Sequence, residues 1–271
     1  MLKPKYFIVW LIRAFGILGL VEWLRFIKET KWSIAAKENK EFVKSHPDFP
    51  LPPMNVAYDA YGGIDWEYYY NSGIETSQKI GSIILKYCNE KRYKVLEWGC
   101  GPAFVIRHMH KTLGCNAEIF GSDYNTATIR WCKSAIHGVS FIENKLAPPL
   151  PLESDMFHFV YVLSVFTHLS EKNCMLWIRE LRRVLKPGGV LIFTTKGESL
   201  IERLMPHEKK MIMEGRPVAR GKVKEGKRVF DTFHPSSYVK DIMLDGFEIL
   251  EYTPHGLENY KQNLWVVRKN K

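Results

Sequence analysis

The most informative motif of this chain is Val95-Leu96-Glu97-Trp98-Gly99-Cys100-Gly101-Pro102. Its first four residues are typical of a buried strand, and its two glycines allow a sharp turn into a following helix. Glycine at such a turn lets a ligand approach the backbone closely, and the free N–H groups of a helix N-terminus attract polar groups. The sequence therefore predicts a ligand site directly after this strand.

A second predicted strand ends at a carboxylate, Asp123, placed where it could bind the ribose of a nucleoside ligand. Asp123 follows Gly101 by 22 residues, and a carboxylate there can accept hydrogen bonds from ribose hydroxyls. The unit of strand, glycine loop, helix, strand and acid indicates an adenosine-type cofactor. A dinucleotide fingerprint would have a third glycine at position 104. Phe104 stands there, which disfavours NAD.

Short apolar runs alternate with helical stretches along the rest of the chain, which is typical of a parallel sheet with crossover helices. The final two strands, joined through Pro254 and Gly256, indicate an antiparallel strand inserted at the sheet edge. We therefore expect an α/β fold with a seven-stranded, mostly parallel, doubly wound sheet, an antiparallel last strand and an N-terminal helical extension. Strands are expected at 94–98, 118–122, 139–143, 157–166, 190–195, 247–252 and 263–268, and helices at 74–88, 103–113, 125–136, 171–185 and 235–244.

These motifs together resemble the class I S-adenosylmethionine-dependent methyltransferases. The first motif of that family, two hydrophobic residues and an acid followed by x-Gly-x-Gly, matches residues 95–101, and its second-strand acid matches Asp123. Its phrase Arg-Val-Leu-Lys-Pro-Gly-Gly-x-Leu is intact from Arg183 to Leu191. The resemblance covers residues 75–200 and 235–268. It implies a methyltransferase with S-adenosylmethionine as cofactor, and no metal is expected.

The resemblance also implies which residues bind the cofactor. Glu97 would lie near the methionine ammonium group, with Gly99 and Gly101 beside the amino-acid moiety, and Asp123 would bind the ribose. The complete set is Glu97, Gly99, Gly101, Asp123, Tyr124, Asn144, Leu146 and Ser164.

Four of these residues would contact the adenine ring or the sulfonium. Asn144 can accept a hydrogen bond from the adenine amino group through its carbonyl. Tyr124 and Leu146 would cover the two faces of the ring; the alternative for both is core packing. Ser164, at the end of the fourth strand, would face the sulfonium.

Methyl transfer requires a nucleophile aligned with the methyl group, and an alcohol acceptor also requires a base. His168 follows the fourth strand at its carboxyl end, where open α/β sheets bind their ligands, and it is the first candidate for the base. The alternative for His168 is a loop histidine that bonds to backbone. His234, at the entry to a later helix, is the second candidate.

An aromatic segment before the core is the candidate acceptor site. Tyr58 and Tyr61 with Asp59 offer an aromatic floor and a carboxylate, which suit a sugar ring. The same residues could instead form the core of an N-terminal lid.

The net charge of +10 is concentrated in two segments. Residues 1–44 and 201–228 each hold nine Lys or Arg against four Asp or Glu, and the rest of the chain is neutral. We divide the chain into a helical extension to residue 44, a linker and lid at 45–93, and a core at 94–271 with a basic lid insertion at 198–231. The basic lid suggests an anionic target, such as a phosphate, a lipid pyrophosphate, a nucleic acid or anionic lipid headgroups. The alternative is a solvated charged face.

Residues 6–27 suit an amphipathic helix that lies at a membrane surface. Arg13, Glu22 and Arg25 leave no uncharged run long enough for a span, and Arg13 also argues against a signal peptide. The helix could instead pack on its own domain or on a second subunit in a homodimer. Five cysteines without a C-x-x-C spacing fit a reducing compartment. We expect a cytoplasmic protein, peripheral at the inner face of the membrane.

The favoured function is methyl transfer to a hydroxyl of a small-molecule or glycan acceptor, lipid-linked if the protein works at a membrane. Three phrases resemble, more loosely, enzymes that modify bacterial polysaccharides: Phe49-Pro50-Leu51-Pro52-Pro53, residues 164–169, and Pro254-x-Gly256-x-x-Asn259-x-x-Gln262. One alternative is an RNA or protein methyltransferase that uses the basic segments, although no nucleic-acid module is recognisable. A cofactor-binding partner protein without catalysis is the other alternative.

Overall fold

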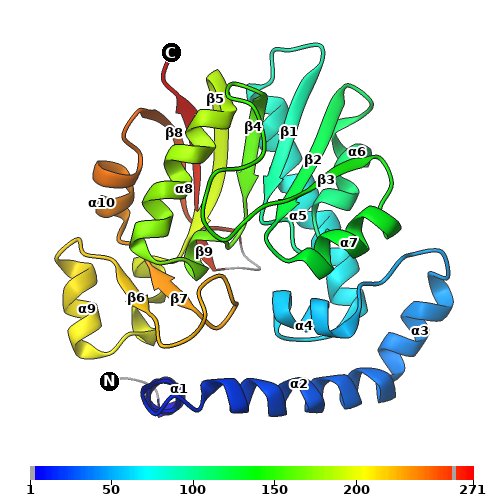
Figure 1. The fold of residues 1–271 in the computed structure, drawn as a ribbon, viewed down its shortest axis with the longest axis vertical. Helices are drawn as coiled ribbons and strands as arrows, with labels where there is room; N and C mark the ends of the chain where they lie inside the picture. Colours follow the sequence, from blue (N-terminus) through cyan, green and yellow to red (C-terminus); the bar gives the residue numbers. More distant parts are fainter. Residues whose placement is uncertain (1–3, 258–260) are drawn as a thin grey trace. The chain divides into compact units, whose positions relative to one another are not determined.

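The computed structural model describes residues 4–257 and 261–271, which form two compact units. One unit holds residues 19–144, and the other holds residues up to 18 together with 145–271. Seven strands follow the order β3-β2-β1-β4-β5-β9-β8 (Figure 1). This order, with β9 antiparallel to both of its neighbours, confirms the predicted α/β fold class.

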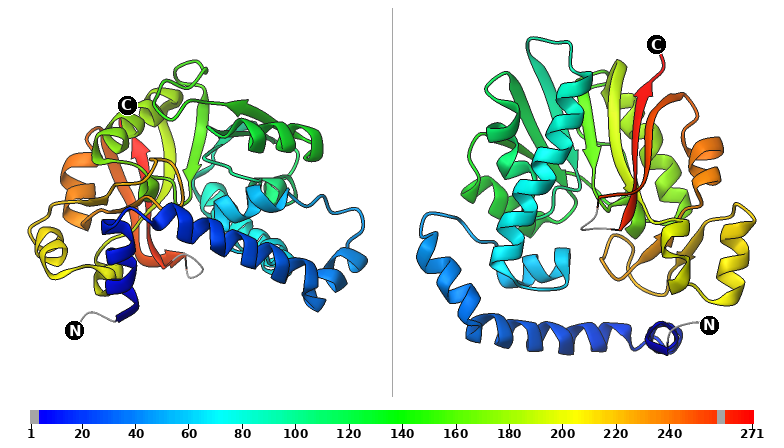
Figure 2. Two further views of the ribbon diagram at one scale, coloured as in Figure 1. Left: turned by 60° about the horizontal axis from the view of Figure 1, so that its bottom comes forward. Right: turned by 180° about the vertical axis from the view of Figure 1, so that it is seen from behind.

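In the unit of residues 19–144, three parallel strands carry the glycine loop and the acid. Five of the six residues of β1 are buried, Lys94 being the exception, so this strand is buried on both faces. Helices α5 and α7 cover opposite faces of these strands (Figures 1 and 2). The elements are α5 (Trp66–Tyr87), β1 (Tyr93–Trp98), α6 (Met109–Leu113), β2 (Ala117–Asp123), α7 (Thr126–Ala135) and β3 (Val139–Glu143).

In the other unit, β9 pairs antiparallel with β5 on one side and with β8 on the other. The inserted antiparallel strand that Pro254 and Gly256 indicated is thereby confirmed. The elements are β4 (Phe157–Val162), α8 (Glu171–Val184), β5 (Leu185–Thr195), α10 (Ser236–Tyr238), a π-helical turn (Val239–Met243), β8 (Phe247–Leu257) and β9 (Gln262–Lys269).

Two predicted elements are shorter than expected. The helix expected at 103–113 begins only with a 3-10 turn at Ile106–His108, because Ala103 has a positive φ of 57° and residues before it form turns. The strand expected at 157–166 ends at Val162, and Phe166–His168 form a separate 3-10 turn. This second difference matters for function because it puts His168 on a short turn after the strand.

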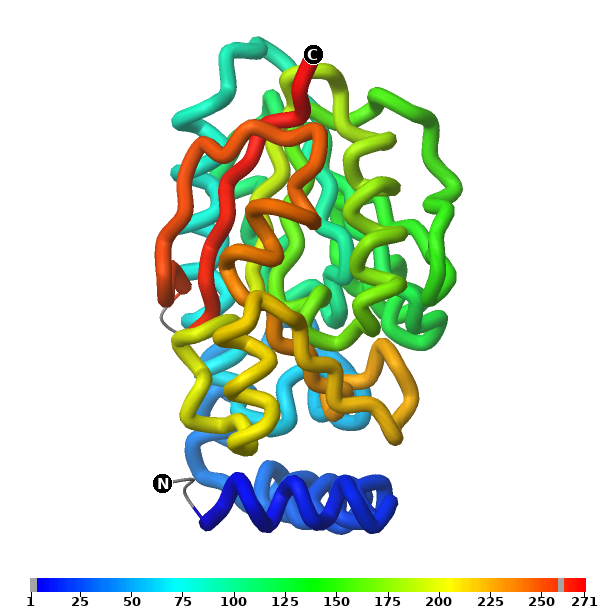
Figure 3. Tube along the Cα trace, turned by 90° about the vertical axis from the view of Figure 1, so that its left-hand side faces the viewer, coloured from blue at the N-terminus to red at the C-terminus, as the bar shows by residue number. Residues whose placement is uncertain are grey.

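The insertion at 198–231 has secondary structure and a small core of its own, neither of which was predicted. Leu200, Leu204, Ile212, Val218 and Phe233 pack together as a buried cluster, and Figure 3 follows this segment in yellow and orange. Its elements are a 3-10 helix (Glu198–Arg203), α9 (Pro206–Met213), β6 (Val218–Arg220) and β7 (Asp231–Phe233), the last two paired antiparallel.

The N-terminal segment is three helices, so the prediction of one continuous helix over residues 6–27 is wrong. Gly16, with a φ of 73°, stands between the first two helices, and this left-handed conformation ends a helix. No single described helix meets the length and hydropathy of a membrane span, whereas α1 and α2 meet them only as a bent pair. The helices are α1 (Pro4–Ala14), α2 (Leu18–Ala35) and α3 (Lys37–Ser45), followed by α4 (Met54–Tyr61).

Each of the first two helices is tied to its own unit. Helix α1 contacts the insertion, since Arg13 Nη1 donates to the carbonyl of Arg220 at 2.8 Å. Helix α2 contacts α4, since the Tyr58 hydroxyl donates to the Glu22 carboxylate at 3.3 Å and the Phe26 and Tyr58 rings lie 5.3 Å apart.

Candidate functional site

The glycine loop after β1 is held against the end of β2. The N–H of Gly99 donates to the carbonyl of Ser122 at 2.7 Å. Gly99 and Gly101 both have positive φ, 77° and 48°, a conformation that favours glycine. A Cβ at Gly101 would meet only the Cβ of Ala60, at 3.9 Å. The loop therefore leaves room for a ligand between Gly101 and α4.

Asp123 is fixed by the loop that the sequence associated with it. Its Oδ2 accepts a hydrogen bond from the N–H of Gly101 at 3.0 Å, and its Oδ1 accepts one from the N–H of Asn125 at 2.8 Å. Burial raises the pKa of Asp123, and the nearby charge of Asp59 acts in the same direction. The site thus holds two carboxylates near each other, Asp123 on β2 and Asp59 on α4.

Three further predicted cofactor residues lie at the carboxyl ends of the same strands. Glu97 is buried on β1, and Asn144 is buried after β3, where its N–H donates to the carbonyl of Asp123 at 3.0 Å. Burial and the charges of Asp59 and Asp123 raise the pKa of Tyr124, which keeps its hydroxyl protonated. The unit of residues 19–144 therefore brings together six of the eight predicted residues.

The other two predicted cofactor residues, Leu146 and Ser164, belong to the second unit. The carbonyl of Leu146 accepts a hydrogen bond from Trp177 Nε1 at 2.8 Å. Ser164 has a φ of 63°, and its hydroxyl accepts a hydrogen bond from Gln262 Nε2 at 2.8 Å. A non-glycine residue with positive φ at the end of a strand is strained, and such strain often marks a functional position.

His168 is oriented by the insertion. Its Nδ1 lies 2.7 Å from the carbonyl of Phe230, so Nδ1 carries the proton and donates it. In the neutral ring the lone pair is then on Nε2. Burial and the charge of Lys196 lower the pKa of His168 to about 4, which keeps the ring neutral near pH 7. The N–H of Gly226 also donates to the carbonyl of His168, at 2.9 Å.

A partly buried ion pair that the sequence did not predict lies near His168. Lys196 Nζ contacts Asp231 Oδ1 at 2.5 Å, and Arg220 Nη1 lies 3.9 Å from Asp231 Oδ2. Although burial alone would raise it, these cations lower the pKa of Asp231. No motif signals this pair, because its members are 35 residues apart and one of them lies in the insertion.

His234 is completely buried after β7. Its N–H donates to the carbonyl of Lys196 at 2.7 Å, while neither ring nitrogen has a hydrogen-bond partner among the described residues. Burial lowers the pKa of His234 to about 4. Both imidazoles are therefore held neutral, and His234 is fully enclosed whereas His168 is partly exposed.

The three predicted acceptor residues separate into different surroundings. Tyr58 is buried against α2, as expected for the lid-core alternative. Asp59 influences the pKa of Asp123 and of Tyr124, which puts it beside the expected ribose position. Tyr61 lines a pocket of about 320 Å³.

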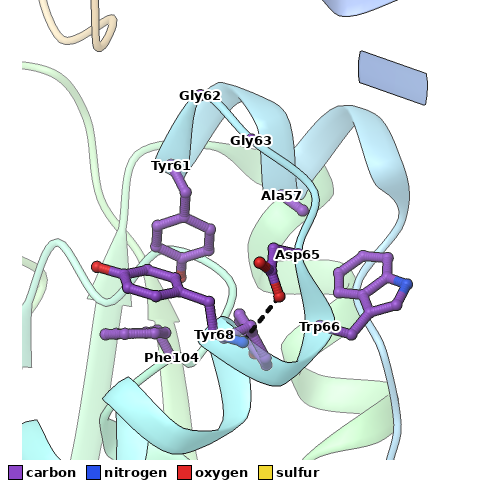
Figure 4. Close-up of a pocket in the computed structure, with 9 residues that line it drawn as sticks. Ala57, Tyr61, Gly62, Gly63, Asp65, Trp66, Tyr68 and Phe104 are labelled. Carbon is purple, nitrogen blue, oxygen red and sulfur yellow. Dashed lines mark hydrogen bonds between the residues drawn. The ribbon is translucent and has the colours of Figure 1, made fainter. Parts of the chain in front are cut away.

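That pocket is lined mainly by aromatic rings (Figure 4). The ring of Tyr61 lies 5.1 Å from that of Phe104, which follows the glycine loop. Asp65 is the single carboxylate of the lining, and its Oδ1 accepts a hydrogen bond from the N–H of Tyr68 at 2.9 Å. The lining residues are Ala57, Tyr61, Gly62, Gly63, Asp65, Trp66, Tyr68, Tyr69 and Phe104.

Tyr69 joins this pocket to the glycine loop. Its hydroxyl donates to the carbonyl of Pro102 at 2.6 Å and accepts a hydrogen bond from Arg107 Nη1 at 3.1 Å. Arg107 also donates to the carbonyl of Pro50 and stacks on the ring of Phe49, 3.8 Å from its centroid. The proline-rich linker is thus packed beside the loop, a contact that sequence reasoning missed.

Comparison with known proteins gives one family match. Residues 95–189 match a family model described as a methyltransferase domain. Over 102 residues the chain is 31% identical to a probable phthiotriol/phenolphthiotriol dimycocerosates methyltransferase of Mycobacterium ulcerans, covering 37% of this chain and 38% of that protein. Over 177 residues it is 22% identical to an uncharacterized protein of Methanocaldococcus jannaschii, covering 64% and 63%. The chain therefore spans less than two thirds of the length of these relatives.

Solved structures share the fold. A SAM-dependent methyltransferase of Methanosarcina mazei is similar with a TM-score of 0.53 and 20% identity, covering 69% of this chain and 97% of that one. A protein of Pyrococcus horikoshii is similar with a TM-score of 0.55 and 23% identity, covering 77% and 100%. At these identities the likeness shows the fold alone.

Proposed function

We propose that this chain, whose residues 95–189 match a methyltransferase domain, is a class I S-adenosylmethionine-dependent enzyme that transfers a methyl group to a hydroxyl of a small-molecule or glycan acceptor. The family and the cofactor agree with the sequence prediction. The observation that carries the proposal is the hydrogen bond between Asp123 and the N–H of Gly101, because it joins the two family motifs in one site.

The residues at the ends of β1, β2 and β3 fit this cofactor. When bound, S-adenosylmethionine supplies a methyl group on a sulfonium. The buried carboxylate of Glu97 provides an anionic partner for its ammonium group. Asp123 can accept hydrogen bonds from ribose hydroxyls, and Asn144 can accept one from the adenine amino group. The open space over Gly101 admits the amino-acid part close to the backbone.

Replacement of Asp123 with alanine is expected to weaken binding of S-adenosylhomocysteine, measured by calorimetry. Charge-assisted hydrogen bonds contribute about 1.5–3 kcal/mol, which corresponds to a loss of roughly 10- to 100-fold in affinity. Asp155→Ala is the matched control, because this exposed carboxylate pairs with Lys269 instead. Unchanged affinity in Asp123→Ala would remove the ribose assignment, and tighter binding of NAD would contradict the cofactor.

The aromatic pocket supports a sugar as the acceptor. The apolar faces of sugar rings pack on aromatic side chains, and Tyr61, Tyr68 and Phe104 line this pocket. Asp65 is available there to accept a hydrogen bond from a hydroxyl. Because Phe104 directly follows the glycine loop, a ring in the pocket would lie near the cofactor's amino-acid moiety.

His168 is proposed as the base that accepts the proton of the acceptor hydroxyl. The Phe230 carbonyl holds the proton on Nδ1, which leaves the lone pair of Nε2 for the acceptor. The lowered pKa keeps this nitrogen unprotonated at neutral pH. His234 remains the second candidate.

A membrane surface is the proposed location of the acceptor, which would then be lipid-linked. Helix α2 directs Glu22 and Phe26 toward Tyr58, while Leu20, Trp23 and Leu24 are exposed. Exposed apolar residues on a helix within a basic segment are typical of interfacial helices.

Replacing both Trp23 and Leu24 with serine is therefore expected to abolish flotation of the protein with anionic liposomes. Binding of the unmodified protein should weaken with salt but persist in part, because each basic residue near the surface contributes about 1 kcal/mol that salt screens, whereas the apolar contribution remains. Substitution is preferable to removing residues 1–44, since that removal would also delete Asn39, which bonds to Ile64.

Leu85→Ser is the control for flotation, because Leu85 is an exposed leucine on the separate helix α5. If the unmodified protein stays in solution and the Trp23 and Leu24 variant loses a dimer in sedimentation, the helix serves assembly. That result would contradict the membrane proposal.

A further inference from the structure

Three buried polar side chains gather where β5 ends, and they lack the hydrogen bonds that burial normally demands. His234, Asn263 and Gln262 are 0%, 1% and 3% exposed. Both ring nitrogens of His234, both amide atoms of Asn263 and Oε1 of Gln262 have no partner among the described residues.

Strand pairing and close contacts bring these side chains to one edge of the sheet. Asn263 is paired in register with Thr195, the last residue of β5. A Cβ on Gly197 would come within 2.7 Å of the Asn263 amide nitrogen and 3.0 Å of the His234 carbonyl, so the glycine allows both to approach. Gln262 reaches the end of β4 through its 2.8 Å hydrogen bond to Ser164. The carboxyl ends of β4 and β5 are the edge at which open α/β sheets bind ligands.

Asn39 shows how the same fold treats a structural asparagine. It is also buried, yet its Nδ2 donates to the carbonyl of Ile64 at 2.9 Å and to the Ser33 hydroxyl at 2.7 Å. Its Oδ1 accepts a hydrogen bond from the N–H of Trp66 at 3.0 Å. Buried polar groups are nearly always satisfied in this way, because an unpaired one costs free energy. Asn263 differs from Asn39 in that its amide atoms have no hydrogen-bond partner among the described residues.

The chemistry of the three side chains selects uncharged hydroxyl groups. Gln262 offers an acceptor, Asn263 offers donors and an acceptor, and a neutral His234 offers one of each. A hydroxyl group is itself both donor and acceptor and therefore matches this set. The nearby cation, Lys196, is already paired with Asp231 at 2.5 Å. A phosphate or carboxylate would thus face the acceptor oxygens of Gln262 and Asn263, while the charge of Lys196 is already balanced by Asp231.

We propose that Gln262, Asn263 and His234 form the recognition site for uncharged hydroxyl groups of the methyl acceptor. This inference rests on the proposed methyl transfer to a hydroxyl. It makes His234 a binding residue, with His168 as the base.

The first test compares thermal stability of the full chain in two matched variants. Asn39→Leu removes a fully bonded amide and should lower the melting temperature by several degrees. Asn263→Leu removes an unbonded amide of similar size, so its melting temperature should stay the same or rise. An equal loss of stability in both variants would show that Asn263 has a structural role and would overturn the inference.

The second test measures ligand binding directly, by saturation-transfer NMR with S-adenosylhomocysteine present. The probes are uncharged methyl glycosides of glucose, galactose, mannose and rhamnose, with glucuronate and glucose 6-phosphate as charged counterparts. We expect an uncharged glycoside to bind, its affinity to fall at least about tenfold in Asn263→Leu, and the charged probes not to displace it. The inference is overturned if no uncharged glycoside binds, if Asn263→Leu binds it normally, or if a charged probe displaces it. Failure of S-adenosylhomocysteine to bind in calorimetry would instead count against the proposed function. The two outcomes are distinguishable because calorimetry measures cofactor binding and NMR measures glycoside binding.

Discussion

Replacing His168 with alanine is expected to lower kcat about 10²–10⁴-fold, the usual effect of losing a general base. The affinity for S-adenosylhomocysteine should change little, because the predicted ammonium and ribose contacts of the cofactor lie on β1 and β2. The size of the effect follows from the fixed geometry of the ring. The Phe230 carbonyl determines which nitrogen carries the proton, so no rotation of the imidazole is needed before Nε2 accepts the proton of the hydroxyl.

The pH profile gives this prediction a distinctive signature. Because burial lowers the pKa of His168 to about 4, the neutral, active form dominates at all pH values well above 4. The rate of the unmodified enzyme should therefore be flat between about pH 6 and 8 and should fall only as the pH approaches 4, where the ring takes up a proton. The residual rate of His168→Ala should lack this acidic limb.

His207→Ala is the control for the His168 substitution, because this exposed histidine of α9 has no role in the proposed site. A rise in KM alone in His168→Ala would make His168 an acceptor-binding residue. The base would then lie elsewhere, and His234 would be the next residue to test.

The cofactor side of the site was predictable from sequence because its geometry is local. A strand that turns through glycines into a helix, followed by a second parallel strand, brings the ends of the two strands together. Gly101 and Asp123 therefore meet although 22 residues separate them. The parallel pairings of β1 with β2, β2 with β3 and β4 with β5 follow from the same repeated unit, whereas β9 pairs antiparallel with β5 and β8.

The catalytic side was less predictable because its contacts are made between distant segments. His168 was recognised from its place after the fourth strand, but its partner Phe230 is 62 residues away in the insertion. From its sequence, the insertion is predicted to be a charged lid. Its strands β6 and β7 are too short to show the alternating pattern of a strand. The Tyr58 side chain likewise packs in the lid core, where its hydroxyl bonds to Glu22, a partner 36 residues away.

The N-terminal helix break shows how a periodic pattern can mislead. The pattern over residues 6–27 predicts one helix that would pass through Gly16. Its positive φ instead ends α1, and the two resulting helices make contacts with different parts of the chain. A glycine in a helical pattern is a weak signal by itself, since glycine is also the usual residue at a helix end.

Replacing Glu208 with alanine is expected to destabilise the protein by about 3–5 kcal/mol, the usual cost of removing one partner from a buried ion pair. The side chains of Glu208 and Arg220 are only 7% and 10% exposed, and two hydrogen bonds of 2.9 and 2.5 Å join the carboxylate to the guanidinium. Glu208 also accepts a hydrogen bond from the N–H of Met205 at the start of α9. Its removal leaves a buried cation without its main countercharge.

Urea unfolding measures this loss, with Glu214→Ala as the matched control. Glu214 pairs with Arg216 at the same 2.5 Å, but both side chains are largely exposed, so its loss should cost no more than about 1 kcal/mol. The carbonyl of Arg220 also accepts a hydrogen bond from Arg13 of α1, and its guanidinium lies near Asp231. Asp231 directly follows Phe230, whose carbonyl orients His168. Glu208→Ala should therefore lower activity even under conditions in which the core stays folded. Similar unfolding free energies for the two variants would contradict the idea that this buried pair anchors the insertion. Full activity in Glu208→Ala would show that the pair is not needed to orient His168.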